Sequence, residues 1–512
     1  VVFILVLTGG LGVLGKLLPG GFMPSEDMGY LMVNIQLPDA ASLQRSDAVV
    51  RKVEAIIGKH EEVEFVTAAT GFSLISGSMS SNAGFIFVSL KDWDEREKTA
   101  NALVAALNRD FAAEVNEAQV FAFGPPPIPG LGSGSGFTLM VQDRAGNTPD
   151  YLANQTVNFI QAALQRPEIG SMFTTFRASV PQRYIEINRD KVLKAGVSLN
   201  DMYTTVGAFL GGSYVNDFNR FGRLYKAYIQ AEPEYRINEE KIDLFFLKNG
   251  AGERVPLSAF VTVKDIAGPD YTTRFNLYRA IELTGAPAPG YTSAQALDAL
   301  EEVAQASLPA DMGYAWSNMS FQEKKSSGSG AIVFAFSLLF VFLILAAQYE
   351  SWSLPLSILL GTPFAIFGAF LSLFLARLAS TSYELNVFAQ IALVMLIGMA
   401  AKNAILIVEF ANIEFNKGLS LFDAAIKAAT LRFRPILMTA FSFILGVFPL
   451  VLASGAGAEA RVVMGMALLG GMALATVLGV FFYPMLFVFI GKLAGYEKKR
   501  ARQEQQGATI DA

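Results

Sequence analysis

Five stretches in the last third of this chain are long and apolar enough to cross a lipid bilayer, and they restrict its fold more than any other feature. A membrane-spanning helix needs about 20 mostly apolar residues. The stretches that meet this requirement are residues 330–348, 354–375, 387–410, 435–452 and 462–490. We therefore expect a multi-pass helical membrane protein rather than a soluble enzyme, in agreement with 52% apolar and only 17% charged residues.

A sixth apolar segment opens the chain. Residues 1–15 are uncharged, but they are short for a complete span, and the chain begins with Val rather than Met. The segment also lacks the basic start of a signal peptide. We expect residues 1–19 to be a first membrane helix that is truncated, which makes six spans in all.

The basic residues of the short loops predict the orientation in the membrane, because cytoplasmic loops are enriched in Lys and Arg. Basic residues are concentrated between the third and fourth late spans and after the last one, whereas the alternate short loops hold only Arg377 and Arg461. The residues in the first two places are Lys417, Lys427, Arg432, Arg434, Lys492, Lys498, Lys499, Arg500 and Arg502. This predicts a cytoplasmic tail at 492–512 and an extracytoplasmic location for the roughly 300 residues after the first span.

What the chain lacks excludes several kinds of chemistry. It has no cysteine, so it forms no disulfide or thiolate site, and its single histidine, His60, is predicted to lie at a solvated helix end. A net charge of −5 gives no basic surface for nucleic acid. The glycine-rich run 130–136 precedes a predicted strand and is not followed by Lys-Ser/Thr, so we interpret it as a linker rather than a nucleotide-binding loop.

The region between the first and second spans alternates strand-like and helix-like patterns. Residues 30–37, 64–70, 84–90 and 118–123 are predicted strands, and 40–60 and 95–113 are predicted helices. This βαββαβ order is typical of the split βαβ, or ferredoxin-like, unit. A second copy is predicted from strands at 137–142, 172–177, 183–187 and 280–284 and helices at 149–165, 199–210 and 293–307. Residues 211–263 are predicted to be an insertion with hairpin character.

Lys402 lies well inside the third late span, where a charged residue costs about 2.5–3.5 kcal/mol and requires a partner. The acidic residue available in these spans is Glu409, seven residues further and about 10 Å along the helix, which is too far for contact. Lys402 therefore predicts a membrane carboxylate on a segment outside this chain. Asn403, Arg432 and Thr439 are the other polar candidates near it, although Arg432 also fits simple anchoring and Thr439 fits a bond to its own helix.

Phenylalanines recur in the extracytoplasmic strands. Residues two apart on a strand share a face, so Phe85 lies beside Phe87, and Phe121 beside Phe123. Most such pairs belong to an ordinary core. The segment 71–83, which contains Phe72, is apolar at one end and rich in Ser and Gly at the other, and it is longer than a hairpin turn, so we expect either a movable binding loop or a plain connection.

Four long motifs resemble the resistance-nodulation-division exporters, in their hydrophobe/amphiphile efflux branch. They are Gly211-Gly-Ser-Tyr-Val-Asn-Asp-Phe218, Tyr349-Glu-Ser-Trp-Ser353, Ala401-Lys-Asn-Ala-Ile-Leu-Ile-Val-Glu-Phe410 and Arg434-Pro-Ile-Leu-Met-Thr439. The resemblance covers essentially the whole chain, which looks like the C-terminal half of the pump subunit. It implies a proton-driven multidrug exporter of the Gram-negative inner membrane, with no cofactor besides the proton-motive force. It also implies a homotrimer with a periplasmic adaptor and an outer-membrane channel.

The resemblance further implies roles for individual residues. Lys402, with Asn403 beside it, Arg432 and Thr439 match the proton relay, whose aspartates belong to the other half. The implied substrate-binding positions are Phe72, Leu74, Phe87, Phe121, Phe123 and Arg177. Thr67 and Leu74 stand where well-studied pumps have Phe. Residues 71–83 resemble the switch loop, and 211–263 resemble a docking element that reaches into a neighbouring subunit.

The same resemblance implies the domain boundaries. A first periplasmic porter subdomain takes residues 20–124, a second takes 125–210 and 264–327, and the five-helix membrane bundle takes 328–491. Two alternatives remain open, a metal-ion or lipid exporter of the same superfamily and a membrane scaffold that does not transport. No methionine or acidic ligand set favours the metal exporter, and a scaffold would have no use for Lys402.

Overall fold

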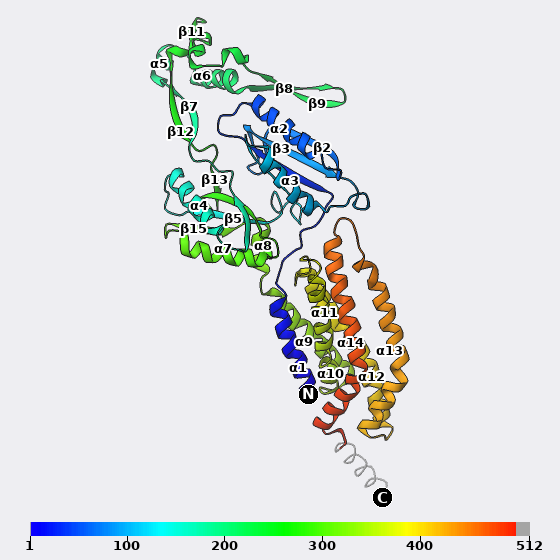
Figure 1. Ribbon diagram of the computed structural model, residues 1–512. Coiled ribbons are helices and arrows are strands. Elements are labelled where there is room, and N and C mark those ends of the chain that lie inside the picture. The colour runs from blue at the N-terminus through cyan, green and yellow to red at the C-terminus, as the bar shows by residue number, and fades with distance from the viewer. Residues whose placement is uncertain (1, 498–512) are drawn as a thin grey trace. The chain divides into compact units, whose positions relative to one another are not determined.

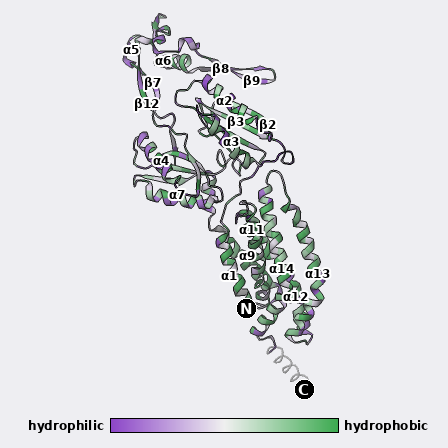
Figure 2. Ribbon diagram, in the orientation of Figure 1, coloured by the Kyte–Doolittle hydropathy of each residue, from purple (hydrophilic) through white to green (hydrophobic). Residues whose placement is uncertain are grey.

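The computed structural model describes residues 2–497 and divides the chain into two compact units (Figure 1). One unit consists of residues 177–271, and the other contains the rest of the described chain. The unit outside residues 177–271 holds the long apolar helices of the described chain, which are mostly green in Figure 2. The predicted tail at 492–512, including Lys498, Lys499, Arg500 and Arg502, lies almost entirely outside the described residues.

Five helical segments are long and apolar enough to span a membrane, as predicted. The helices are α9 (Ser329–Tyr349), α10 (Leu354–Leu359), α11 (Thr362–Arg377), α12 (Val387–Asn416), α13 (Leu421–Val451) and α14 (Ala458–Leu493). The second span is divided into α10 and α11 by a break at residues 360–361, next to Pro363 in the first turn of α11. The opening segment forms a shorter apolar helix, α1 (Val2–Leu17).

The prediction that a helix begins at Pro435 is wrong, because α13 begins fourteen residues earlier, at Leu421. Ser420 caps this earlier start, since its side chain accepts a hydrogen bond from the backbone N–H of Asp423. Small and apolar residues of the first turns, such as Ala424 and Ala428, are buried against the bundle. Packing of this face therefore continues the helix through Arg432, Arg434 and Pro435.

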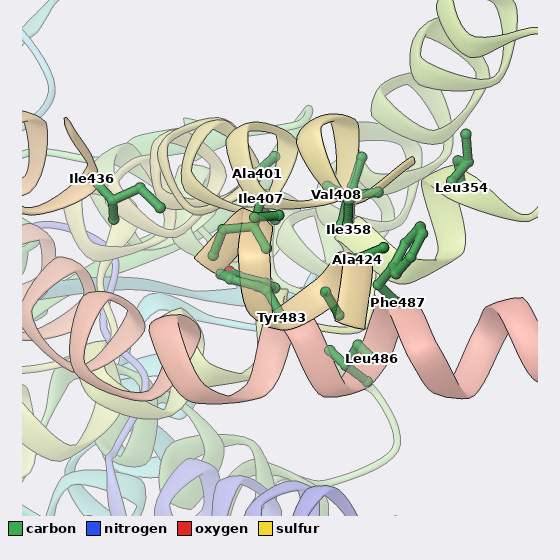
Figure 3. Close-up of a cluster of buried hydrophobic side chains, with 14 of the residues drawn as sticks. Leu354, Ile358, Ala401, Ile407, Val408, Ala424, Ile436, Tyr483, Leu486 and Phe487 are labelled. Carbon is green, nitrogen blue, oxygen red and sulfur yellow. The ribbon is translucent and has the colours of Figure 1, made fainter. Parts of the chain in front are cut away.

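The bundle is held together by close contact between helices. Figure 3 shows one of its buried clusters, in which Ala401 and Ile407 of α12 lie near Tyr483 and Phe487 of α14 and Ile436 of α13. Helices α11 and α14 approach closely at small residues: a Cβ at Gly368 would lie 2.6 Å from the carbonyl oxygen of Gly470. Small residues at the contact allow helices to pack in a lipid environment, where the hydrophobic effect does not drive association.

The first sheet follows α1 and has the predicted order of elements. These are β1 (Tyr30–Gln36), α2 (Leu43–Ile57), β2 (Val63–Ser73), β3 (Ser78–Leu90), α3 (Ala100–Glu114) and β4 (Gln119–Phe123), with a short 3-10 turn η1 (Trp93–Glu95). The strands are antiparallel in the order β2-β3-β1-β4. Leu31, Val33 and Ile86 face α2 and α3 and form a core with them. One face of the sheet is therefore covered by helices.

A second sheet contains strands from both sides of the 177–271 unit. Its elements are β5 (Phe137–Asp143), α4 (Pro149–Ala163), β6 (Ile169–Phe173), β13 (Thr273–Phe275), β14 (Tyr278–Pro287), α7 (Ser293–Ser307) and β15 (Met312–Trp316), followed by α8 (Asn318–Ser326). Strand β14 pairs with both β5 and β6, and β15 pairs with β5. Its core joins Leu139 and Leu283 of the sheet to Phe159 of α4 and Leu300 of α7.

The insertion is wider than the predicted 211–263. Strands β7 (Val180–Ile187) and β12 (Val261–Gly268) pair with each other along their full length and close the 177–271 unit, so the predicted strand 183–187 does not belong to the second sheet. The predicted helix 199–210 also lies in this unit, as α6 with a π-helical turn η2. The other elements of this unit are α5 (Arg189–Lys194), α6 (Leu199–Val206), η2 (Gly207–Gly211), β8 (Ser213–Arg220), β9 (Arg223–Ile229), η3 (Pro233–Tyr235), η4 (Glu239–Leu244), β10 (Phe246–Lys248), β11 (Arg254–Pro256) and η5 (Leu257–Ala259).

Candidate functional site

The face of the first sheet that points away from α2 and α3 is lined with aromatic side chains. Met32 of β1 pairs with Phe87 on one side and Phe123 on the other, and Asn34 pairs with Phe85 and Phe121. Directly paired residues of an antiparallel sheet project to the same face. The four phenylalanines therefore share a face opposite to the one that packs on α2 and α3, as their spacing predicted for each pair.

Ring contacts join this aromatic face to its surroundings. Tyr30 stacks on Phe87 with ring centroids 4.9 Å apart, and Phe121 lies 5.9 Å from Phe123. Phe121 also contacts Phe173 of β6, at 4.1 Å, which connects the face to the second sheet. Phe87 remains 37% exposed, so its ring is open to a further apolar partner. Such surfaces bind apolar molecules through contact area and ring geometry rather than one hydrogen-bond pattern.

Asn34 is a polar residue at the centre of this face that the sequence analysis did not identify. It is 1% exposed, and neither atom of its side-chain amide has a hydrogen-bond partner among the described residues. An unsatisfied buried amide costs free energy, so Asn34 is an unusual residue among these rings. Its position between Phe85 and Phe121 follows from the register of β1 against β3 and β4, which the sequence does not show.

The segment 71–83 is not a long loop, and that prediction is wrong. Strands β2 and β3 continue to Ser73 and Ser78, with Phe72 paired with Met79, so that only residues 74–77, including Leu74, form a turn. Side-chain hydrogen bonds explain why this segment is a regular strand. For example, the hydroxyl of Ser81 donates to the carbonyl of Ala41 at 3.0 Å. The serine-rich half of the segment is thus held in a strand by bonds to residues outside it.

A bulge interrupts the pairing of β2 with β3 just before Phe72. The pairing passes from Thr70 with Gly84 to Phe72 with Met79, so residue 71 of β2 lies opposite residues 80–83 of β3. Gly71 has a φ of +87°, which favours glycine. Beyond the bulge, Phe72 and Ser73 pair with Met79 and Ser78 and close the hairpin.

The predicted substrate-binding residues are divided between the two units of the chain. Arg177 is the first residue of the 177–271 unit, whereas Phe121 and Phe123 belong to the other unit. Its role beside these rings remains a prediction.

In the membrane helices, Lys402 is the residue for which a carboxylate partner was predicted outside this chain. It lies on α12, and its side chain is exposed and forms neither an ion pair nor a hydrogen bond with any residue in the described range 2–497. Further along α12, Glu414 forms ion pairs with Lys417 at 2.8 Å and Lys427 at 2.6 Å. The lysine thus presents an unpaired amine on the outside of this bundle.

Arg432 and Thr439 lie on the neighbouring helix α13 at different depths. The Arg432 guanidinium lies 3.5 Å from the ring centroid of Phe410, and its Nε is buried without a hydrogen-bond partner among the described residues. Phe410 is eight residues from Lys402, about 12 Å along α12. Because α13 runs antiparallel to α12, Thr439, seven residues after Arg432, lies at about the depth of Lys402. Its hydroxyl donates a hydrogen bond to the carbonyl of Ile436 at 3.0 Å.

Two further polar groups lie on or beside the turn of α12 that carries Lys402. Asn403 is 2% exposed, and both atoms of its side-chain amide lack a partner in the part of the chain described. Tyr483 of α14, which the sequence analysis missed, is 1% exposed and donates its hydroxyl to the carbonyl of Ala400 at 3.3 Å (Figure 3). Tyr483 therefore ties α14 to the turn of α12 that carries Lys402, a relation that no local pattern indicates.

Comparison with known proteins identifies relatives of this arrangement. The profile of the AcrB/AcrD/AcrF family matches residues 1–491. The chain is 40% identical over 482 residues to the multidrug/solvent efflux pump membrane transporter MepB of Pseudomonas putida, covering 93% of this chain and 45% of that protein. It is 38% identical over 491 residues to the multidrug export protein AcrF of Escherichia coli strain K12, covering 95% and 47%.

The matches share one further property. The solvent-resistant pump membrane transporter SrpB of Pseudomonas putida is 36% identical over 495 residues, with 96% of this chain and 46% of that protein covered. The chain thus spans about half the length of the curated relatives it matches.

Proposed function

We infer that this chain, which belongs to the AcrB/AcrD/AcrF family of resistance-nodulation-division efflux transporters, is the C-terminal half of a proton-driven exporter of drugs and other amphiphilic molecules. The observation that carries this proposal is the amine of Lys402 on a membrane helix, which has no partner among residues 2–497. A lysine at this depth of a membrane requires a carboxylate, and a second half of similar length would supply it. Relatives named as efflux pumps, of which this chain covers about half, support both parts of the proposal.

The proposed energy coupling follows from the charge of that carboxylate. When it is ionised, it attracts Lys402, and when it takes up a proton, the attraction is lost and α12 can settle in another position. A membrane potential supplies about 2.3 kcal/mol per charge per 100 mV, to which a pH gradient adds. This is enough to shift a two-state helix bundle by some tens of fold per proton. Asn403, Arg432 and Thr439 provide the neighbouring polar groups.

The proposed substrate surface is the aromatic face of the first sheet. Phe72, Phe87, Phe121 and Phe123 bind ring and alkyl surfaces. Leu74, in the turn between β2 and β3, provides further apolar area, and Arg177 a positive charge. This composition suits varied amphiphiles, because apolar contact tolerates changes of shape.

The proposed assembly is a homotrimer that works with a periplasmic adaptor and an outer-membrane channel. Within the 177–271 unit, the hairpin of β8 and β9 exposes a row of aromatic and aliphatic side chains. They are Tyr214, Val215, Phe218, Phe221, Leu224, Tyr225, Tyr228 and Ile229. An exposed apolar hairpin of this kind fits a protein interface, here the neighbouring protomer.

The proposed orientation places both sheets in the periplasm of a Gram-negative cell. Lys417 at the α12–α13 connection and Lys427 in the second turn of α13 support a cytoplasmic location for that end of the bundle. The strand orders β2-β3-β1-β4 and β6-β14-β5-β15 support two ferredoxin-like units outside the membrane, with α1 as a sixth membrane helix.

The test uses the complete transporter in cells that lack other pumps. Drug accumulation is measured with and without a protonophore, for the natural protein, for Lys402→Ala and for the control Lys417→Ala, whose side chain is 63% exposed. We expect the protonophore and Lys402→Ala each to abolish efflux at unchanged expression and trimer content, and the control to pump. Normal efflux by Lys402→Ala would remove this lysine from the mechanism.

A further inference from the structure

Glu26 and Asp27 are adjacent residues between α1 and β1, and their side chains bind different parts of the molecule. One oxygen of Asp27 accepts hydrogen bonds from the Arg96 guanidinium at 2.7 Å and the indole N–H of Trp93 at 3.2 Å. Its other oxygen accepts the backbone N–H of Ala100, the first residue of α3, at 2.7 Å. Burial acts to raise the pKa of Asp27, but Arg96 and the backbone N–H groups outweigh it and lower the pKa. Asp27 is therefore a fixed charge that locks this segment to the first sheet unit.

Glu26 instead binds the beginning of a membrane helix. Its two carboxylate oxygens accept the backbone N–H groups of Glu459 at 3.2 Å and Ala460 at 2.9 Å, in the first turn of α14. The residue before this helix is Gly457, with φ +73°, and it has no side chain that could supply a cap. The first N–H groups of a helix need acceptors, and a carboxylate is favoured there by the helix dipole. Glu26 provides this cap from 433 residues away in the sequence.

The loop before α14 also lies beside the first sheet unit. A Cβ built on Gly455 of this loop would lie 3.8 Å from the ring of Trp93. Trp93 is the residue whose indole N–H binds Asp27. The loop before α14 and the segment 26–27 thus lie against the same part of the first sheet unit.

Helix α14 also reaches the turn that carries the relay lysine. It is the longest helix described, with 36 residues, and its Tyr483 donates to the carbonyl of Ala400, two residues before Lys402. A continuous set of contacts therefore runs from α12 through Tyr483 and α14 to Glu26, and from Asp27 to α3.

We propose that Glu26 is a positioning residue that couples α14 to the first sheet unit during transport. Its cap makes a shift of α14 move the segment 26–27, and Asp27 passes this movement to α3 and the sheet that carries the aromatic face. Without the cap, the glycine-containing loop before α14 would absorb the movement. This inference rests on the proposed export function.

The test compares Glu26→Ala, Glu26→Gln and the control Glu97→Ala in the complete transporter. Glu97 is an exposed carboxylate of the same region. We expect Glu26→Ala to lower the maximal efflux rate per folded molecule by about two- to thirty-fold, the equilibrium range for loss of a helix cap, with an unchanged half-saturating substrate concentration. Glu26→Gln, which keeps an acceptor oxygen, should restore most of the rate, and Glu97→Ala should match the natural protein.

Hydrogen exchange of the purified protein gives a readout that does not depend on transport. Amides of residues 458–461 should exchange faster in Glu26→Ala than in the natural protein, while amides of mid-helix residues 470–480 should not change. An unchanged exchange rate would overturn the inference even if the protein pumps. Loss of pumping by the natural protein would instead overturn the proposed function alone.

Three other results would also overturn the proposed role of Glu26. They are a natural rate per molecule in Glu26→Ala, an increase of the half-saturating concentration at full maximal rate, and failure of both Glu26 variants to accumulate. The last result would make Glu26 a residue needed only for folding.

Discussion

The contact between α11 and α14 makes Gly368→Ala a sharp test of how this bundle is packed. A Cβ at position 368 would lie 2.6 Å from the carbonyl oxygen of Gly470, 2.7 Å from the Cβ of Leu474 and 3.1 Å from the Cα of Gly471. Carbon atoms in contact are normally about 3.5–4.0 Å apart. The obstacle is largely backbone, which cannot rotate away as a long side chain can, so the two helices must separate by several tenths of an ångström.

Overpacking of this kind costs about 1–3 kcal/mol. The control is Gly446→Ala on α13, where no atom lies within 4 Å of the added Cβ. Replacing glycine by alanine in an open helix position is neutral or stabilises by up to about 1 kcal/mol. The two substitutions are chemically identical, so their difference measures the α11–α14 contact.

The assay is thermal unfolding of the purified protein in detergent, followed by the loss of a monodisperse peak in size-exclusion chromatography. We expect Gly368→Ala to unfold at a lower temperature than the natural protein, and Gly446→Ala to unfold at the same or a slightly higher temperature. A Gly368→Ala variant as stable as Gly446→Ala would refute the close approach of these helices.

The remaining predictions concern the aromatic face and pH. Phe87→Ala should remove the stack on Tyr30 and change the range of exported compounds, with two- to ten-fold losses of resistance of the order expected for about 0.5–1.5 kcal/mol of ring contact, at unchanged assembly; an unchanged susceptibility panel would count against the site. Burial raises the pKa of Glu384 from 4.5 to about 7, with Arg377 lowering it and Glu323 raising it, so the folded state binds this proton more tightly than the unfolded chain. The stability that this provides, of order 3 kcal/mol, is present below pH 4.5 and is lost as the pH rises through about 7. Melting temperatures between pH 5 and 8 should fall for the natural protein and stay flatter for Glu384→Gln, and equal slopes would contradict the assignment.

Local sequence patterns predicted the membrane part in detail, with one informative failure. Apolar length alone located all five spans, because insertion into a bilayer depends on the residues of each segment. The start of α13 was missed because Arg432, Arg434 and Pro435 together resemble a loop followed by a helix start. The decisive features were a cap at Ser420 and the burial of Ala424 and Ala428, which depend on neighbouring helices.

Periodicity also predicted the paired phenylalanines of the first sheet, but not the polar residue among them. The face of Phe85 and Phe87 follows from their spacing on one strand. That Asn34 stands between Phe85 and Phe121 depends on the register of β1 against two other strands. The hairpin at 71–83 was misjudged for the same kind of reason, since its serines are ordered by bonds to residues such as Ala41 on another segment.

By itself, the sequence determined the membrane class and the order of strands and helices in the first sheet, and it predicts an opposite charge beside Lys402. These properties follow from transfer free energies and side-chain alternation within a segment. Only the tertiary structure decided that Glu26 caps α14, that Tyr483 holds the turn before Lys402, and that β7 pairs with β12 to close a separate unit. Each of these contacts joins residues far apart in the chain, and their partners are selected by packing and register over the whole molecule rather than by any local pattern.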